Sequence, residues 1–518
     1  MKLYTAEAMR EVDRISIEEM RIPSLLLMEN AATAVAQALL ELVPELLSGS
    51  VTVLCGKGNN GGDGMAVARL LKGKGYEPEV LLAAEPSGLS GDAAAQFERL
   101  RSCGVAFRVV SGADSLPLVR ARLEGTDLVV DALLGTGLSG PAQGHHAELI
   151  EAVNSSGAFV AAVDVPSGLS GNAMGPFGPA MEADLTLTLA LAKPVLYTPE
   201  GAVFCGEVKV LDIGEPDEAV AQVAPTAELL DEAWAAPFFA EREPGTHKGH
   251  IGRVLIVAGS RGKSGASVLA ARGALRAGSG LVTVGVPASM QPVVAASLSE
   301  AMTLALPETR EGTLSMDALV PILEFCPHVD AVGIGPGIGD VPETAALCRD
   351  LYAQVLLPMA VDADGLNAFR GLAGHLQRHG GPRILTPHPG EMGRLLGTTG
   401  EEVVRHRYEI GPAKSREWGV ALILKGYRTL VASADAPWRL NLSGGPHMAG
   451  PGFGDVLTGI VTALLGQRLN PFDAASLGAW WHGAAADEAS QKLGGYGLLA
   501  SECADALPAV EGRLRERC

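Results

Sequence analysis

The sequence predicts two α/β domains, each with a mostly parallel sheet that is covered by helices on both faces. Short, nearly continuous apolar runs alternate with helical patterns along the chain, which indicates strands that are buried on both sides. Hydrophobic residues make up 47% of the 518 residues and charged residues only 19%, so material for such strands is ample. Glycine is abundant at 65 residues while aromatic residues reach only 4%, which suits many tight turns between strands and helices.

The first domain is predicted to begin with two helices and to continue as alternating strands and helices. Residues 5–42 have a helical pattern that Pro23 interrupts. Strand candidates follow at residues 51–55, 80–83, 129–134, 159–165, 184–190 and 208–213. The pattern then lapses at residues 214–228, which we interpret as a linker between domains of residues 1–220 and 221–518.

The second domain is predicted to repeat this alternation. Its strand candidates are residues 254–257, 281–286, 331–334, 360–361, 384–385 and 420–424. Helical patterns lie between them, and residues 456–467 and 471–491 are predicted to form the last helices. The apolar run 281–298 contains two prolines, so it predicts a strand and a turn rather than a membrane span.

Charge and cysteine usage limit the partners and the compartment of the protein. A net charge of −19 argues against a nucleic-acid or anionic-membrane partner. The seven cysteines are dispersed without a Cys-x-x-Cys pair, which favours reduced thiols over disulfides or a zinc site. The N-terminal residues lack the apolar core of a signal peptide, so a cytoplasmic location is expected.

A glycine-rich loop, Gly56–Gly64, follows the first predicted strand and precedes a helix. It matches neither a dinucleotide fingerprint nor a P-loop, but its exposed N–H groups could hold a pyrophosphate or a ribose. The alternative is a plain turn with asparagine caps. Two more polar loops, at residues 131–141 and 164–169, also follow strands. Because ligands of open parallel sheets bind beyond the carboxyl ends of the strands, the three loops predict one site.

These loops, together with Met28-Glu29-Asn30-Ala31, resemble the epimerase domain of the NAD(P)H-hydrate repair proteins. The resemblance covers roughly residues 1–214 and implies a Rossmann-like three-layer α/β/α fold. It implies a potassium ion held by the oxygen ligands Asn60, Asp131 and Ser167. It also implies that the hydrated nucleotide is bound by Asn59, Asn60, Gly61, Gly62, Asp63, Gly135, Thr136, Gly137, Leu138, Ser139, Gly140, Pro141 and Asp164.

Epimerisation at the hydrated nicotinamide carbon requires that the hydroxyl leaves and returns, or that the ring opens and closes. Either path needs an acid–base group beside the ring. Asp63 and Asp164 are the catalytic candidates, with Lys193 as a third, and no individual role is assigned among them.

Asp455 lies in the glycine-rich segment Gly450–Gly459, at the predicted start of a helix. The N–H groups at a helix N-terminus attract phosphate, and glycine lets the phosphate come close. Because a carboxylate repels phosphate, Asp455 is better suited to take a proton from a hydroxyl that attacks the phosphate. The alternative is that Gly454-Asp455 only caps the helix.

Other polar residues of the second domain also follow predicted strands. Asp362 and Asp364 place carboxylates where Mg²⁺ can bind through water, although Asp364 could instead cap a helix. His388 lies between two prolines, which predicts a positioned side chain. Lys425 ends a strand and places a cation near the expected phosphates.

The order of these segments resembles the ribokinase-like superfamily, and Thr386-Pro-His-Pro-Gly-Glu-Met392 resembles its nucleotide-dependent NAD(P)H-hydrate dehydratases. The resemblance covers about residue 225 to the end. It implies that the hydrate contacts Ala266, Gly337, His388 and Asp455. It further implies that the adenine nucleotide contacts Lys425, Gly426, Tyr427, Arg428, Thr429 and Gly454.

The segment before Asp455 departs from the family pattern. The family's asparagine, threonine and serine are replaced by Gly445, Gly450 and Phe453. Phe453 cannot donate a side-chain hydrogen bond, and Pro451 removes a backbone N–H from the anion-binding loop. We therefore expect an altered phosphate-binding loop around the base.

Together the resemblances imply a bifunctional enzyme that epimerises hydrated NADH or NADPH and dehydrates the S form. They imply K⁺ in the first domain, and Mg²⁺ with ADP as the phosphoryl donor in the second. A homo-oligomer without a nucleic-acid or membrane partner is expected. The alternatives are a ribokinase-like kinase for a vitamin precursor and a non-catalytic dinucleotide-binding protein.

Overall fold

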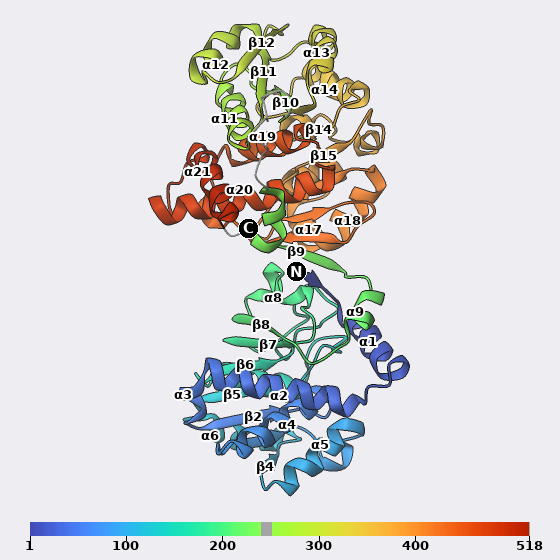
Figure 1. Ribbon diagram of the computed structural model, residues 1–518, viewed down its shortest axis with the longest axis vertical. Helices are drawn as coiled ribbons and strands as arrows, with labels where there is room; N and C mark the ends of the chain where they lie inside the picture. The colour runs from blue at the N-terminus through green and yellow to red at the C-terminus, as the bar shows by residue number, and fades with distance from the viewer. Residues whose placement is uncertain (240–250, 517–518) are drawn as a thin grey trace. The chain divides into compact units, whose positions relative to one another are not determined.

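The computed structural model of the chain describes residues 1–239 and 251–516 (Figure 1). Contacts among these residues divide the chain into two compact units, Lys2–Ala227 and Glu228–Cys518, the second of which includes Met1. The division falls inside the stretch 214–228 in which the sequence pattern lapses.

The first unit contains a seven-stranded sheet in the order β4-β3-β2-β5-β6-β7-β8. All neighbouring strands pair in parallel, as the continuous apolar runs predict. The strand order reverses between β2 and β5, and this is where open parallel sheets bind ligands. Its strands are β2 (Val51–Cys55), β3 (Glu79–Leu82), β4 (Ala106–Val109), β5 (Leu128–Ala132), β6 (Phe159–Val163), β7 (Leu185–Leu189) and β8 (Glu207–Leu211), and the two-residue strand β1 (Lys2–Leu3) lies outside this sheet.

Helices cover both faces of this sheet, which confirms the predicted three layers. The apolar residues of α2, α4 and α5 form one buried cluster with the sheet, and those of α6 and α7 form another. The helices are α1 (Ala6–Arg14), α2 (Ser24–Leu42), α3 (Pro44–Leu47), α4 (Asn59–Gly73), α5 (Gly91–Ser102), α6 (Leu116–Leu123), α7 (His145–Asn154), α8 (Pro199–Ala202) and α9 (Asp217–Gln222).

Helix α2 is the one helix among the described residues that is long and apolar enough to cross a membrane. Its inner face, with Ala32, Val35 and Leu39, is buried in the cluster that covers the sheet. About half of its apolar window, 44%, is buried in this way.

The second unit contains a larger mixed sheet, in which the order runs β9-β18-β17-β16-β15-β14-β13-β10-β11-β12. The strands from β12 to β16 are parallel, whereas β17 and β18 add an antiparallel edge that the sequence did not predict. The strands are β9 (Ala227–Leu230), β10 (Arg253–Val257), β11 (Leu281–Pro287), β12 (Met302–Leu306), β13 (Ala331–Ile334), β14 (Met359–Val361), β15 (Arg383–Leu385), β16 (Ala421–Leu424), β17 (Leu430–Ala432) and β18 (Trp438–Asn441).

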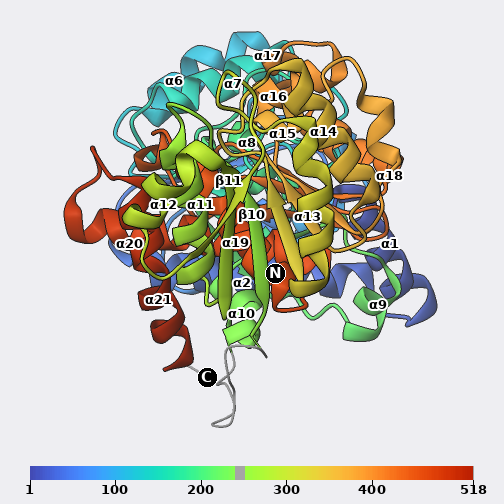
Figure 2. The same ribbon diagram turned by 90° about the horizontal axis from the view of Figure 1, so that it is seen from above.

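Helices lie on both sides of the parallel strands, with α11 and α12 on one side of β10 and β11 and with α13 and α14 on the other (Figure 2). The helices are α10 (Glu232–Ala235), α11 (Ser264–Arg276), α12 (Gln291–Ser297), α13 (Leu319–Phe325), α14 (Pro342–Gln354), α15 (Asp364–Asn367), α16 (Pro389–Leu396), α17 (Gly400–Arg405), α18 (Arg407–Trp418), α19 (Phe453–Gly466), α20 (Pro471–Leu493) and α21 (Ala500–Arg515). Helix α21 was not predicted.

Helices α11 and α19 approach each other closely because both carry glycine at their contact. A Cβ atom on Gly459 would lie 1.9 Å from the Ala270 carbonyl oxygen, and one on Gly273 would lie 2.4 Å from that of Val456. The two backbones therefore touch. This contact fixes where the first turn of α19 lies relative to the ends of the strands.

Candidate active sites in the two units

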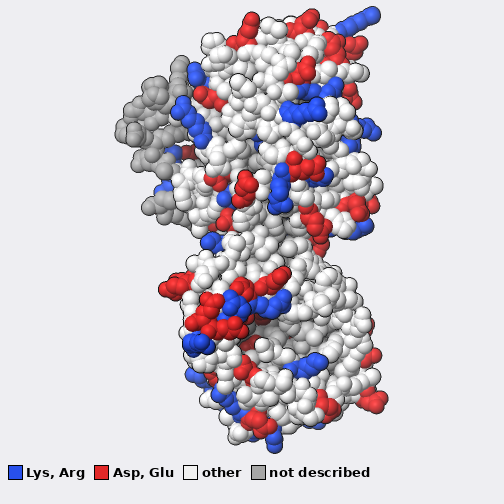
Figure 3. Space-filling model, turned by 90° about the vertical axis from the view of Figure 1, so that its right-hand side faces the viewer, with Lys and Arg blue, Asp and Glu red and all other residues white. Residues whose placement is uncertain are grey.

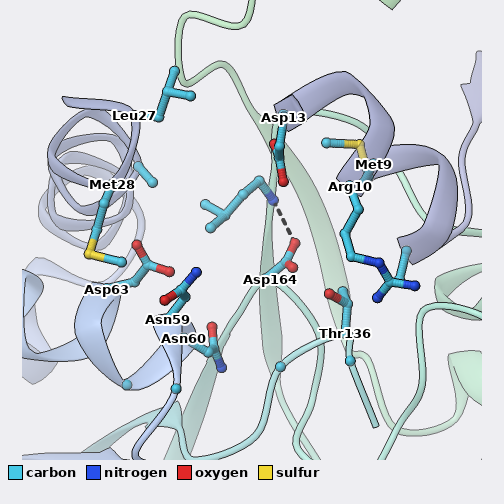
Figure 4. Close-up of a pocket in the computed structure, with 18 of the residues that line it drawn as sticks. Met9, Arg10, Asp13, Leu27, Met28, Asn59, Asn60, Asp63, Thr136 and Asp164 are labelled. Atoms are coloured by element: carbon cyan, nitrogen blue, oxygen red, sulfur yellow. Dashed lines mark hydrogen bonds between the residues drawn. The ribbon is translucent and has the colours of Figure 1, made fainter. Parts of the chain in front are cut away.

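A cavity of about 590 Å³ opens in the first unit where β2, β5, β6 and β7 end. In the face drawn in Figure 3, acidic and basic side chains gather beside a hollow in this lower unit. The cavity is lined by the start of α4, by the loops after β5 and β6, and by helices α1 and α2 (Figure 4). The three polar loops thus meet at one site.

The start of α4 lies against the strand ends because its first turn is glycine-rich. A Cβ atom on Gly61 would lie 1.9 Å from the carbonyl oxygen of Gly56, so no larger residue fits there. Gly58 occupies the N-cap, and Asn59 and Asn60 begin the helix at the cavity. The free N–H groups of this turn therefore border the cavity.

The three predicted cation ligands lie together beside the Leu134 peptide. The Ser167 hydroxyl donates to Asp131 over 2.6 Å, and the Ser167 N–H donates to the same carboxylate over 2.8 Å. The Asn60 side-chain amide donates to the Leu134 carbonyl over 3.1 Å. Burial raises the pKa of Asp131 to about 6, although the Ser167 donors and the Leu133 N–H lower it. Among the described residues no cationic side chain pairs with Asp131, so this oxygen-rich cluster fits a bound monovalent cation.

Asp164 is held in a left-handed backbone conformation, with φ of 69°. Its Oδ1 atom accepts hydrogen bonds from the Leu189 N–H at 3.1 Å and the Thr188 hydroxyl at 3.2 Å. The same oxygen pairs with the Lys193 ammonium, and that side chain is only 2% exposed. Lys193 also donates to the Leu189 carbonyl over 2.8 Å, so the pair is anchored to the end of β7.

Asp63 is buried at the edge of the same cavity. Burial raises the pKa of Asp63 well above its usual value, and the charges of Asp164, Asp13 and Asp92 raise it further. The surroundings of Asp63 therefore favour its protonated form.

The predicted nucleotide-binding residues divide into two groups. Asn59, Asn60, Gly61, Asp63, Gly135, Thr136, Gly137, Leu138 and Asp164 line the cavity. Gly62, Ser139, Gly140 and Pro141 lie outside the lining. Gly62 backs onto Met28 and Ala93 instead, because a Cβ atom there would lie 3.0 Å from the Met28 methyl group.

Sequence reasoning missed one wall of this cavity. Ala6, Met9, Arg10, Asp13 and Ile17 line it from the first helical segment, and Glu215 lines it from a later loop. The spacing of the residues from the first helical segment could have predicted this wall, because intervals of three or four residues place side chains on one helix face.

In the second unit, Asp362 ends β14 at the centre of a buried polar cluster. Its Oδ1 atom lies 2.7 Å from the Lys425 ammonium, and its Oδ2 atom accepts from the Thr458 hydroxyl over 3.0 Å. Glu391 lies 3.7 Å from the same ammonium. Burial opposes the charge on Lys425, but Asp362 and Glu391 outweigh it and raise the pKa of this lysine.

Asp455 is the third residue of α19 and lies in the field of this cluster. Gly452, with φ of 90°, occupies the N-cap, so the capping alternative does not describe how this helix begins. Burial raises the pKa of Asp455 to about 7, with further increases from Asp362 and Asp364 and an opposing effect of Lys425. A carboxyl group with this pKa can accept a proton near neutral pH.

His388 is the N-cap of α16. Its Nδ1 atom accepts from the Gly390 N–H over 3.0 Å, while the His388 N–H donates to Glu391 over 2.8 Å. Burial and the charges of Lys425 and Arg394 lower the pKa of His388, although Glu391 opposes them. The prolines thus position this histidine, and its half-exposed ring is a neutral hydrogen-bonding group.

Ala266 and Gly337, which were predicted to contact the hydrate, lie side by side. A Cβ atom on Gly337 would lie 2.9 Å from that of Ala266. The same loop is tied to Asp364, whose carboxylate accepts from the Gly339 N–H over 2.9 Å.

A second cavity, of about 520 Å³, adjoins the start of α19. Lys425, Gly426, Tyr427, Thr429 and Gly454 line it as predicted for a nucleotide site, whereas Arg428 lies outside the lining. Phe453 also lines it, and its ring is 5% exposed and packs in the core, 6.0 Å from the ring of His482. The residue that departs from the family pattern therefore forms part of the apolar wall of this cavity.

The fold and the two sites define a two-domain α/β enzyme with a candidate site in each unit. A family model described as NAD(P)H-hydrate dehydratase matches residues 254–509, and one described as YjeF-related protein N-terminus matches residues 24–195.

Similar proteins agree with this division. A bifunctional NAD(P)H-hydrate repair enzyme of Moorella thermoacetica is 44% identical over 517 residues, which cover 100% of this chain and 98% of that protein. The enzyme of the same name from Escherichia coli is 36% identical and covers 87% of this chain and 82% of that protein. A crystal structure of an ADP/ATP-dependent NAD(P)H-hydrate dehydratase from Bacillus subtilis is 28% identical and covers 55% of this chain and 98% of that one, with a TM-score of 0.48.

The chain belongs to the family of bifunctional NAD(P)H-hydrate repair enzymes. The resemblance found in the sequence is thereby confirmed for both halves of the chain.

Proposed function

We propose that the first unit interconverts the R and S epimers of hydrated NADH and NADPH, and that the second dehydrates the S form with ADP. The products of the second reaction are the reduced dinucleotide, AMP and phosphate. The observation that carries this proposal is the half-buried carboxyl group of Asp455, in the first turn of α19 and beside the Lys425–Asp362 pair.

In the second unit, Asp455 takes the proton of the ring hydroxyl, and the hydroxyl oxygen attacks the terminal phosphorus of ADP. The bond from this phosphorus to the bridging oxygen breaks, and AMP leaves with the electron pair. Phosphate is a far better leaving group than hydroxide. The ring then expels it as the adjacent carbon loses a proton, which restores the nicotinamide double bond.

The Lys425 ammonium and the free N–H groups at the start of α19 offset the negative charge that develops on the phosphate oxygens. Asp362 supports this role because it keeps Lys425 charged and fixed at 2.7 Å.

The carboxylates of the second unit do not form a protein-only magnesium site. Both oxygens of Asp362 are already paired, one with Lys425 and one with Thr458. Within residues 1–239 and 251–516, no group of three or more histidine, cysteine or acidic side chains is arranged to hold a metal. Mg²⁺ usually binds through substrate phosphates and water, so we place it on the nucleotide and derive no step from it.

In the first unit, Asn60, Asp131 and Ser167 would hold K⁺, which would supply a positive charge beneath the nucleotide. Asp63 and Asp164 are retained as acid–base candidates, since both line the cavity. We further propose that the protein acts in the cytoplasm as a homo-oligomer.

The test is the recovery of reduced-nicotinamide absorbance after addition of ADP to a mixture of hydrate epimers. We expect complete recovery, because the first unit supplies the S form as the second consumes it. Recovery of only the S fraction would contradict the epimerase assignment, and no recovery would contradict the dehydratase assignment. A stable phosphorylated product without recovery would instead indicate a small-molecule kinase.

A further inference from the structure

The cavity of the first unit has a wall that neither the family pattern nor the predicted site contains. Asp13 of α1 and Glu215, which follows β8, both line it. Both residues lie outside the segment 24–195 that the family model matches. Two carboxyl groups from opposite ends of the unit's sequence therefore meet at the proposed epimerase site.

Asp13 points into the cavity from α1, toward Asp164 on the opposite side (Figure 4). The dashed line in that view marks the hydrogen bond that Asp164 accepts from the Lys193 ammonium, and the charges of both groups act on Asp13. Glu215 is fixed in turn by the hydroxyl of Ser16, one turn further along the same helical segment. Asp13 is therefore near two charged groups, the Glu215 carboxylate and the Lys193 ammonium.

Two other carboxyl groups of the cavity, those of Asp164 and Asp63, are less suited to take a proton and then give it back. Asp164 accepts three hydrogen bonds on one oxygen, from Lys193, Thr188 and the Leu189 N–H, so this oxygen is already occupied. Burial and the like charges around Asp63 raise its pKa well above the usual range, which favours its protonated form.

The charged groups near Asp13 shift its pKa in opposite directions. Burial raises the pKa of Asp13 to about 7, Glu215 and Asp164 raise it as well, and Lys193 lowers it. Arg10 lies one turn earlier on the same helix face and Asp63 lies across the cavity, and Lys57, Asp92 and His146 also line it. The group can exchange protons in both directions near neutral pH.

We propose that Asp13 is the residue that transfers the proton during epimer exchange and that Glu215 positions it; this inference rests on the epimerase function proposed above. The Asp13 carboxylate takes the proton from the hydroxyl oxygen of the hydrated ring carbon. The electron pair of that O–H bond forms a C=O bond, and the bond from this carbon to the ring nitrogen breaks.

The electron pair of the broken C–N bond goes to the nitrogen, which receives the proton that Asp13 had taken. Rotation about the adjacent C–C bond turns the other face of the aldehyde toward the nitrogen. The nitrogen then adds to the carbon while the Asp13 carboxylate takes the proton back from the nitrogen, and Asp13 delivers this proton to the oxygen as the C=O bond becomes a C–O single bond. One carboxyl group therefore completes the cycle without a co-reactant.

The test measures exchange of a purified epimer by the full chain without ADP, and dehydration of the pure S form with ADP. We expect Asp13→Asn to slow exchange by at least about 100-fold and to leave dehydration unchanged. Glu11→Gln is the matched control, since it removes an exposed carboxylate from the same helix without touching the cavity. Exchange by Asp13→Asn within about twofold of the wild-type rate would overturn the inference.

A second measurement separates proton transfer from a purely structural role. Because the carboxylate form acts first, exchange should rise with pH through a limb near the Asp13 pKa of about 7. Glu215→Gln removes a charge that raises this pKa, so the limb should move to lower pH, and Asp13→Glu should restore part of the rate. An unmoved limb together with no rescue would also overturn the inference. If the wild-type chain exchanges no epimers at all, the epimerase function itself is wrong.

Discussion

The two candidate sites share one electrostatic arrangement and differ in what surrounds it. Each holds a buried lysine–aspartate pair at a strand end, Lys193 with Asp164 in the first unit and Lys425 with Asp362 in the second. Each also holds an aspartate whose pKa is raised to about 7, Asp13 and Asp455 respectively.

The residues around each lysine–aspartate pair determine which reaction the site is suited to. The pair of the first unit lies in a cavity lined by further carboxyl groups, which suits the movement of a proton within one substrate. The pair of the second unit lies beside the first turn of a 14-residue helix, where N–H groups and Lys425 can receive phosphate. A raised aspartate pKa alone therefore does not define the reaction.

The largest effect is expected from removal of the proposed base of the second unit. Asp455→Asn should lower the dehydration rate by about 10²- to 10⁴-fold, because the amide cannot take the hydroxyl proton. Epimer exchange by the same variant should be unchanged. Reduced-nicotinamide absorbance and chromatography of the epimers measure the two rates. Loss of both together would show that the two sites do not act independently.

A smaller effect is expected from the cation cluster of the first unit. Asn60→Ala, or replacement of K⁺ by a bulky organic cation, should slow epimer exchange by about 10-fold. Asp131 would then lack the positive charge that its burial requires. Dehydration of the pure S form serves as the internal control. An unchanged exchange rate in both experiments would remove the cation assignment.

The pH dependence of dehydration should report the environment of Asp455. The pKa of Asp455 is raised to about 7, so this residue loses its carboxylate form as the pH falls through that value. The dehydration rate should therefore decline below about pH 7, and this decline is the acidic limb of the pH profile. Asp364→Asn removes a charge that raises this pKa, which should move the limb to lower pH by a fraction of a unit. Measurement of kcat against pH for both proteins tests this, and a limb that stays in place would contradict the proposed role of Asp455.

The smallest effect is expected at His388, which is both a helix cap and a proposed contact to the hydrate. His388→Ala should lower the free energy of unfolding by about 1 kcal/mol through loss of the cap. His388→Asn can keep a capping acceptor, so it should unfold like the wild type while still raising the KM for the hydrate. Denaturant unfolding and KM measured in parallel distinguish the two roles, and an unchanged KM in both variants would remove the contact.

The sequence predicted the fold class, the parallel strands and the convergence of the loops at Asn60, Asp131 and Asp164, because apolar runs and strand-end motifs are local signals. It did not predict the wall from α1, since the part that Asp13 plays depends on packing against residues about 200 positions away. The antiparallel hairpin β17–β18 was missed for a related reason, as its strands are only three and four residues long.

The glycine contact between α11 and α19 limits which substitutions the second unit tolerates. Gly459 lies one helical turn beyond Asp455 and touches the backbone of α11 at Ala270. A single methyl group at that point would wedge the two helices apart and tilt the first turn of α19, moving the carboxyl group away from the strand ends. The alignment of the proposed base thus depends on the absence of a side chain at a position that contacts neither substrate.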